Sequence, residues 1–181
     1  MREPLPNFVY HPDPLATGSI VASEERCGCC GQSRGYKYES TPSIDQDIAV
    51  ICPWCIADGS ARAKFNAEFT DRAGIGDYGS WGTVPGNVAD EIAHRTPGFC
   101  GWQQERWWIC CGDGAAFLGP AGKRELLTYG DSAVDAIRRE SGLGSDEWSS
   151  YFDSLDKEHG PTAYVFRCRH CTKLGGYSDC Q

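Results

Sequence analysis

The hydrophobic positions of the chain fall into short runs that predict a mixture of strands and helices. Runs of β-branched and aromatic residues predict strands at residues 8–10, 20–21, 36–38, 48–51, 104–109, 115–118 and 163–166. Apolar residues at helical spacing and capping residues predict helices at residues 58–65, 85–95, 121–128, 132–140 and 145–155. Residues 70–87 hold five glycines and one proline with little periodicity, which predicts a long loop between two lobes.

The composition excludes several classes of protein. The chain has 181 residues, of which 40% are hydrophobic, so it can build a core and is not wholly disordered. No apolar run approaches the roughly 18 residues needed to span a bilayer. The first residues, from Met1 to Pro6, lack the apolar segment of a secretory signal. We therefore expect a cytoplasmic protein with no membrane insertion.

The charge balance narrows the class of partner. The chain has 17 Lys and Arg against 25 Asp and Glu, a formal net charge of −8. Nucleic-acid binders usually carry a basic domain or stripe, because neutralising phosphates supplies most of their non-specific affinity. The sequence has no such stripe, so nucleic acid is a poor candidate. We expect a protein partner that is neutral or basic.

The eleven cysteines are the main indication of chemistry. Their number is odd, no export signal precedes them, and most of them fall in Cys-x-x-Cys pairs. In a reducing compartment this pattern indicates metal thiolates or redox chemistry and not a framework of disulfides.

Four cysteines in the N-terminal part have the spacing of a zinc site. Cys27 and Cys30 form one Cys-x-x-Cys turn, and Cys52 and Cys55 form a second turn about 20 residues later. Tetrahedral Zn²⁺ takes two thiolates from each such turn, and this separation is typical of a zinc ribbon. We therefore predict that these four residues bind zinc, while Cys29 points elsewhere as a free thiol.

A redox function for Cys52 and Cys55 is the alternative. The pair precedes a predicted helix, whose N-terminus would stabilise the first thiolate. Thioredoxin-like motifs, however, lie early in a βαβ unit, and here another cysteine pair lies at ribbon distance. The spacing therefore favours zinc.

A third pair, Cys168 and Cys171, must find further ligands upstream, and Cys110 with Cys111 is the obvious source. Adjacent side chains alternate in direction on a strand, so we expect only one of Cys110 and Cys111 to point at an ion. The hypothesis is a second zinc bound by Cys111, Cys168 and Cys171, with Cys110 or His170 as its fourth ligand. The alternative is a set of free thiols.

The first and third Cys-x-x-Cys pairs are followed by the same short sequence. Cys27-x-x-Cys30 is followed by Gly35-Tyr36, and Cys168-x-x-Cys171 is followed at the same offsets by Gly176-Tyr177. The repeat suggests that a cysteine knuckle leading into a glycine-kinked aromatic strand is used twice.

The polar residues after Gly101 have two interpretations. Gln103, Gln104 and Glu105 either line a polar pocket or cross-link loops, and the second is the more common role. Glu105, Arg106 and Asp113 are a conceivable acid–base set, for which the simpler interpretation is a structural ion pair.

These motifs, in this order, resemble the CbrC family of small bacterial proteins. The matching stretches are Phe8–Pro14 with Thr17-Gly18, Cys27-x-x-Cys30-Gly31, Cys52–Ala61, Arg95–Gly98, Gly101–Glu105, Cys111–Asp113 and Phe166–Cys171. The resemblance covers nearly the whole chain. It implies tolerance to a DNase-type colicin, with which the family's namesake is associated, and it supplies no catalytic residue.

The chain departs from the family pattern at three cysteines. Cys110 stands where the family has a histidine before Cys-Gly-Asp. Cysteine and histidine exchange as zinc ligands, which favours Cys110 over His170 as the fourth ligand. Cys100 and Cys180 have no place in the pattern and receive no role.

We therefore predict an α+β fold in which a zinc-ribbon-like lobe, residues 1–70, packs on a second α+β lobe, residues 71–181. The expected function is that of a zinc-stabilised binding protein, conferring tolerance or immunity to a nuclease-type bacteriocin whose toxin domain is basic. The alternative is a zinc hydrolase that uses the cluster of Cys111, Cys168 and Cys171 with a bound water. A zinc ribbon that binds nucleic acid is a weaker alternative.

Overall fold

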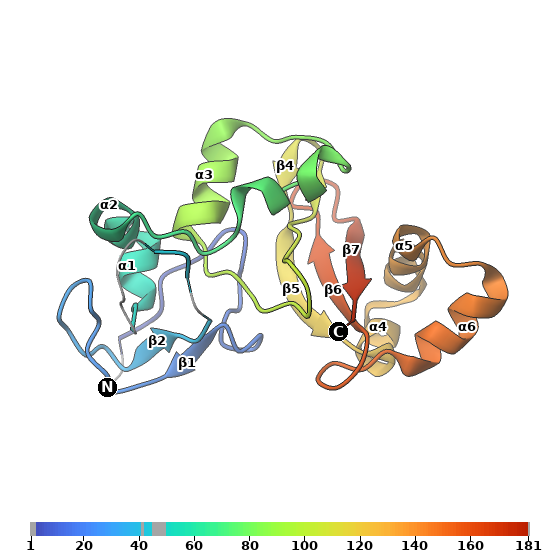
Figure 1. Ribbon diagram of the computed structural model, residues 1–181, viewed down its shortest axis with the longest axis horizontal. Helices are drawn as coiled ribbons and strands as arrows, with labels where there is room; N and C mark the ends of the chain where they lie inside the picture. Colours follow the sequence, from blue (N-terminus) through green and yellow to red (C-terminus); the bar gives the residue numbers. More distant parts are fainter. Residues whose placement is uncertain (1–2, 41, 45–49, 181) are drawn as a thin grey trace.

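The computed structural model describes residues 3–40, 42–44 and 50–180, and it confirms a mixed α+β fold (Figure 1). The strands are β1 (Ile20–Ala22), β2 (Tyr36–Tyr38), β3 (Ile109–Cys110), β4 (Asp113–Gly114), β5 (Ala116–Ala121), β6 (Thr162–Arg167) and β7 (Leu174–Asp179). The helices are α1 (Pro53–Ala57), α2 (Ser60–Phe65), α3 (Gly86–Arg95), α4 (Lys123–Tyr129), α5 (Asp131–Ser141) and α6 (Ser145–Ser154). Within the described residues, no helix has the length and apolar character needed to cross a membrane.

The elements form three groups along the long axis of the molecule, and the chain returns from the last group to the middle one for β6 and β7 (Figure 1). The β1–β2 ribbon lies at one end with α1 and α2, the three-stranded sheet lies in the middle, and α4, α5 and α6 lie at the other end. The separation into two lobes at residue 70 stays a prediction.

Strand β6 organises the central sheet, because β5 and β7 pair with it antiparallel on either side. Its side chains alternate between two cores, as the pleat of a strand requires. Tyr164 and Phe166 belong to an aromatic core that also contains Phe117. Ala163 and Val165 belong to a core formed with α4, α5 and α6. The strand is therefore buried on both faces.

A separate hydrophobic core surrounds the N-terminal cysteines. Its buried members include Cys27, Cys52 and Cys55, which pack with aromatic and branched side chains such as Ile56 and Phe65. The cysteine side chains are therefore part of the hydrophobic core at the N-terminal end of the protein.

Most predicted elements are confirmed, but the strand at residues 8–10 is wrong. This segment makes one backbone hydrogen bond to β5, from Phe117 N to Tyr10 O at 2.8 Å. Pro12 and Pro14 follow it and lack the N–H groups that a ladder needs. Phe8 instead packs in the N-terminal core and Tyr10 in the aromatic core.

The predicted strand at residues 104–109 is also mostly wrong. Only Ile109 lies in a strand, and Trp107 forms an isolated parallel bridge with Ile75. Trp107 is fully buried, and its Nε1 donates to Ala115 O at 3.0 Å. The aromatic residues that suggested a strand are therefore core residues of an irregular segment.

The predicted strand at residues 48–51 lies partly outside the described residues, which exclude 48 and 49. Val50 and Ile51 are buried but belong to no strand, although Tyr38 N donates to Ile51 O at 2.9 Å.

His11 connects the segment Phe8–Pro14 to the segment Arg95–Gly98 inside the protein. Its side chain is completely buried, with Nδ1 2.8 Å from Pro97 O and Nε2 2.7 Å from Thr17 Oγ1. A carbonyl only accepts, so Nδ1 carries the proton and Nε2 accepts from the hydroxyl. Burial outweighs the hydrogen bond to Pro97 and lowers the pKa of His11 to about 4. The ring is therefore neutral at pH 7.

This buried histidine predicts a pH-dependent stability. Between the unfolded pKa of 6.5 and the folded value of about 4, the unfolded chain binds more protons, so stability falls as the pH is lowered through this range. The full contribution, about 3 kcal/mol, is present above pH 6.5. We expect urea unfolding to show a weaker pH dependence for His11→Gln than for the wild type.

His159→Gln is the matched control for that experiment, because the His159 side chain is 83% exposed. It should keep the wild-type pH dependence. Equal slopes for His11→Gln and the wild type between pH 4 and 6.5 would contradict the expectation.

Candidate metal centres

Cys27 and Cys30 lie in a knuckle that follows β1. Cys27 N donates to Gln32 O at 2.9 Å, and Gly31 N donates back to Cys27 O at 2.7 Å. Gly31 takes a φ of 72°, a left-handed conformation in which glycine meets no Cβ penalty. The turn leaves both thiols on one side of the chain.

Cys52 and Cys55 come from the first turn of α1. Pro53 is the first helical residue, a position where its missing N–H is not needed. Cys55 then lies one turn beyond Cys52, and Cys52 N donates to the sulfur of Cys27 at 3.2 Å. This hydrogen bond connects the helix to the knuckle.

The four sulfur atoms of this first group have the geometry of a tetrahedral metal site. All lie within 4.8 Å of one another. The Sγ atoms are 3.8 Å apart for Cys27 and Cys55, 3.8 Å for Cys30 and Cys52, and 3.6 Å for Cys52 and Cys55. A Zn–S bond of about 2.3 Å places tetrahedral sulfurs about 3.8 Å apart, whereas a disulfide needs about 2.05 Å. The group therefore fits a metal ion such as zinc.

The environment of Cys27 favours its thiolate. Contacts with the Cys52 and Cys55 thiols, together with backbone N–H donors, lower the pKa of Cys27 far below that of a free thiol. The thiolate is the form that binds metal.

Cys110 and Cys111 lie at the tip of the β3–β4 hairpin. Cys110 pairs with Asp113 across the ladder, and the two residues between them are the turn. Cys111 and Gly112 have φ values of 55° and 71°, as a two-residue type I′ turn requires. The turn breaks the alternation of a strand and brings both sulfurs to the same side, 3.8 Å apart. The expectation that only one of them points at an ion is therefore wrong.

Cys168 and Cys171 lie in a knuckle that matches the first one. Cys168 N donates to Lys173 O at 2.8 Å, at the same offset as in the first knuckle. His170 N lies 3.4 Å from Cys168 Sγ, as Cys29 N does from Cys27 Sγ. Thr172, with a φ of 60°, takes the left-handed position that Gly31 holds. Strand β7 follows as β2 follows the first knuckle, so the predicted repeat is confirmed.

The second group consists of Cys110, Cys111, Cys168 and Cys171, whose sulfurs also lie within 4.8 Å of one another. The Sγ atoms of Cys110 and Cys171 are 3.8 Å apart, again the edge of a tetrahedron around zinc. Burial alone would raise the pKa of Cys168, but N–H groups of Cys171 and His170 donate to its sulfur and lower the pKa to about 6. This group also fits a metal ion.

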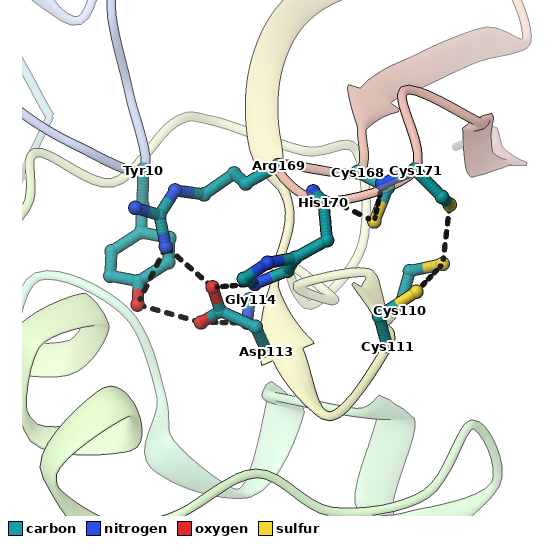
Figure 2. A network of polar contacts seen from close by, with 9 residues as sticks. All are labelled: Tyr10, Cys110, Cys111, Asp113, Gly114, Cys168, Arg169, His170 and Cys171. Atoms are coloured by element: carbon teal, nitrogen blue, oxygen red, sulfur yellow. Dashed lines mark hydrogen bonds and ion pairs between the residues drawn. The ribbon is translucent and has the colours of Figure 1, made fainter.

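His170, the other candidate for the fourth ligand, points away from the sulfurs (Figure 2). Its Nε2 lies 2.8 Å from Asp113 Oδ2. Asp113 is 8% exposed and also accepts from Tyr10 Oη at 2.8 Å, from Gly114 N at 2.8 Å and from Arg169 Nη1. Burial opposes ionisation of Asp113, but these donors and the Arg169 charge lower its pKa.

The hydrogen bonds of Asp113 with Tyr10, Arg169 and His170 form a network beside the four sulfurs of the second group. Arg169 and His170 lie between the two knuckle cysteines, and Asp113 follows the hairpin cysteines. The Asp113 carboxylate therefore fixes the knuckle to the hairpin. Such outer contacts hold metal ligands in position. The sequence indicated the network only through the proximity of these residues to cysteines.

The conceivable acid–base set of Glu105, Arg106 and Asp113 does not form. Arg106 Nη1 pairs instead with Asp77 Oδ2 at 3.4 Å and Glu140 Oε1 at 2.9 Å. Asp113 belongs to the network beside the second group. Arg106 does take part in structural ion pairs, but its partners are Asp77 and Glu140, so the expected ion pair with Glu105 or Asp113 is wrong.

The three remaining cysteines lie outside both groups. Cys29 is half-buried with its sulfur 3.7 Å from Ser60 Oγ, while Cys100 and Cys180 are exposed. The two groups themselves differ in exposure. Three of the four cysteines are buried in the first group and only Cys168 in the second.

Comparison with known proteins finds similar sequences over nearly the whole length of the chain. A family described as "Uncharacterised protein family (UPF0167)" matches residues 5–180. UPF0167 protein PA1536 of Pseudomonas aeruginosa is 41% identical over 94% of this chain and 94% of its own length. UPF0167 proteins of Mycobacterium bovis and Mycobacterium tuberculosis are each 44% identical over 97% of this chain and 93% of theirs. No solved structure matches significantly. The chain therefore belongs to the UPF0167 family.

Proposed function

We propose that each four-cysteine group binds one Zn²⁺ and that the protein is a zinc-stabilised binding protein. The observation that carries this proposal is the spacing of the sulfurs, which are 3.6 to 3.8 Å apart in three pairs of the first group and two pairs of the second. Cys27, Cys30, Cys52 and Cys55 would hold the first ion. Cys110, Cys111, Cys168 and Cys171 would hold the second.

The donor sets favour a structural role for both ions. Four thiolates fill a tetrahedral shell and leave no position for a water or substrate. The hydrolase alternative requires an open position in the second group. The proximity of the Cys110 sulfur to Cys111 and Cys171 argues against that opening, because it supplies a fourth thiolate.

We further propose that the partner is a basic protein, such as the toxin domain of a nuclease-type bacteriocin. The net charge of −8 supports this choice, since an acidic surface accelerates association with a basic one. The resemblance to the CbrC family supports the link to colicin tolerance. The same acidic charge argues against nucleic acid as the partner.

A metal count combined with calorimetry tests the proposal. Mass spectrometry of the freshly purified protein should give two zinc ions per chain. Titration with a DNase-type toxin domain should show binding at low salt that weakens as the salt concentration rises. A metal-free protein that stays folded in EDTA would overturn the zinc proposal. Absence of binding at low salt would overturn the role as a direct toxin inhibitor.

A further inference from the structure

A cavity of about 580 Å³ lies between the loop that contains Tyr78, the segment after Gly101, helix α6 and the end of β7. None of the eight clustered cysteines lines it. Its wall includes Tyr78, Gln103, Gln104, Tyr151 and Asp179. Both interpretations of the glutamines therefore hold. They line this cavity, and they also cross-link loops, because their Nε2 atoms donate to Cys180 O and Asp71 Oδ2 at 2.9 and 2.7 Å.

Asp179 is a carboxylate in this wall with an unused acceptor. The residue is only 7% exposed, and its Oδ2 accepts from Gln103 N at 3.2 Å. Its Oδ1 is buried and has no hydrogen-bond partner among the described residues. Buried oxygen atoms in folded proteins almost always accept a hydrogen bond, so Oδ1 is available to a donor from a ligand. Burial raises the pKa of this carboxyl group, which a nearby cation would counteract.

The charge around the cavity is negative. Arg106 is the one cation in the wall, and its guanidinium is already paired with Asp77 and Glu140. Besides burial, the nearby charges of Asp71, Asp77 and Glu105 raise the pKa of Tyr78. The wall itself contains one carboxylate, that of Asp179, and four more lie close to Tyr78 or Arg106, those of Asp71, Asp77, Glu105 and Glu140. A ligand that enters here gains by carrying positive charge.

Aromatic side chains complete the wall. Tyr78 is 56% exposed, and Tyr151 Oη donates to Ser178 Oγ at 3.0 Å. Aromatic faces attract ammonium and guanidinium groups. The neighbourhood already contains such a contact, because the Arg106 guanidinium lies 4.2 Å from the centre of the Tyr177 ring.

We propose that this cavity binds a protonated amine or guanidinium group, with an N–H donating to Asp179 and the carbon chain lying against Tyr78 and Tyr151. The identity of the ligand's source rests on the proposed function, in which the partner is a basic protein. A basic partner would supply the group as a lysine or arginine side chain. A free polyamine has the same chemistry and is the competing source.

Calorimetry and amide NMR with small probes test this site. N-acetylarginine N-methylamide mimics the side chain within a protein, its citrulline counterpart has the same shape without the charge, and spermidine represents free polyamines. We expect the arginine probe to bind and to shift the side-chain amides of Gln103 and Gln104. The citrulline probe should bind at least about tenfold more weakly, as expected for loss of a charged hydrogen bond. Tighter binding of spermidine would identify the free amine as the source.

Asp179→Asn should weaken the arginine probe about tenfold or more, because it removes the charge and keeps the shape. Asp153→Asn is the matched control, since it removes one charge from a side chain that is 65% exposed and lies outside the cavity wall. If Asp179→Asn does not fold, Tyr78→Asn replaces it, because asparagine tolerates the left-handed φ of 54° at this position.

Equal binding of the arginine and citrulline probes, or equal effects of the cavity variant and Asp153→Asn, would overturn the inference. The zinc content of the same sample separates this result from the proposed function. Two zinc ions without cation binding would remove the cavity site alone. Cation binding to a folded, zinc-free protein would remove the zinc proposal alone.

Discussion

Replacing Cys55 by serine is expected to remove one of the two proposed zinc ions and to unfold the N-terminal core. Cys55 is buried beside Cys27 and Cys52, and the same core contains Ile56 and Phe65. Structural zinc contributes about 10–16 kcal/mol to the folding of small zinc domains, so losing a ligand should destabilise this core by at least about 5 kcal/mol. Mass spectrometry should show one zinc per chain, and the midpoint of urea unfolding should fall.

Cys29→Ser is the matched control for this variant, because Cys29 lies in the same knuckle but outside the group of four sulfurs. It should retain two zinc ions and change stability by less than about 1 kcal/mol. A Cys55→Ser protein with two zinc ions and an unchanged unfolding midpoint would contradict the assignment of the first group.

Replacing Gly176 by alanine should destabilise the central sheet by at least about 3 kcal/mol. Gly176 lies in β7 opposite Val165, with a φ of 147° that L side chains rarely adopt. A Cβ there would lie 1.9 Å from Tyr164 O and 3.3 Å from Ile137 Cδ1. Since the close atom belongs to the backbone of the central strand, β6 and β7 would have to separate. Urea unfolding followed by tryptophan fluorescence measures the loss.

Gly142→Ala separates the two causes of that loss. Gly142 follows α5 with a φ of 67°, and a Cβ there would meet nothing within 4 Å. Only the conformational penalty applies, about 1 kcal/mol. If Gly176→Ala destabilises the protein no more than Gly142→Ala does, the close approach of β7 to β6 is wrong.

The sequence predicts the helices and the cysteine knuckles well, because both depend on local signals. Periodic apolar positions locate α3, α5 and α6, and the short spacing of Cys-x-x-Cys defines each knuckle. Helix α1 has no such signal. It is five residues long and begins at Pro53 between two cysteines, where spacing alone suggests a second knuckle.

The second group is harder to predict, because its geometry depends on a turn and on distant contacts. Cys111 takes a left-handed φ that non-glycine residues seldom adopt, and only the following Gly112 suggests the tight hairpin. The choice between Cys110 and His170 depends on Asp113, whose carboxylate attracts the imidazole. Asp113 lies 57 residues before His170, so no local pattern relates them.

The cavity beside Asp179 shows the same limit. Gln103 and Gln104 suggested a polar pocket, but the rest of its wall comes mainly from three other segments, which contain Tyr78, Tyr151 and Asp179. The strand at residues 8–10 failed for the opposite reason. Phe8 and Tyr10 are buried and Val9 between them is exposed, as on a strand, but the two aromatic side chains enter two different cores and the segment joins no sheet.

The order of the ligands along the chain has a consequence for biosynthesis. All four cysteines of the first group have been made once the ribosome passes Cys55, whereas the second group waits for Cys171, 116 residues later. At ordinary rates of translation this interval is roughly ten seconds. The nascent chain would therefore bind the proposed first metal ion while Cys110 and Cys111 are still unpaired thiols, which leaves these two open to oxidation for longer than the cysteines of the first group.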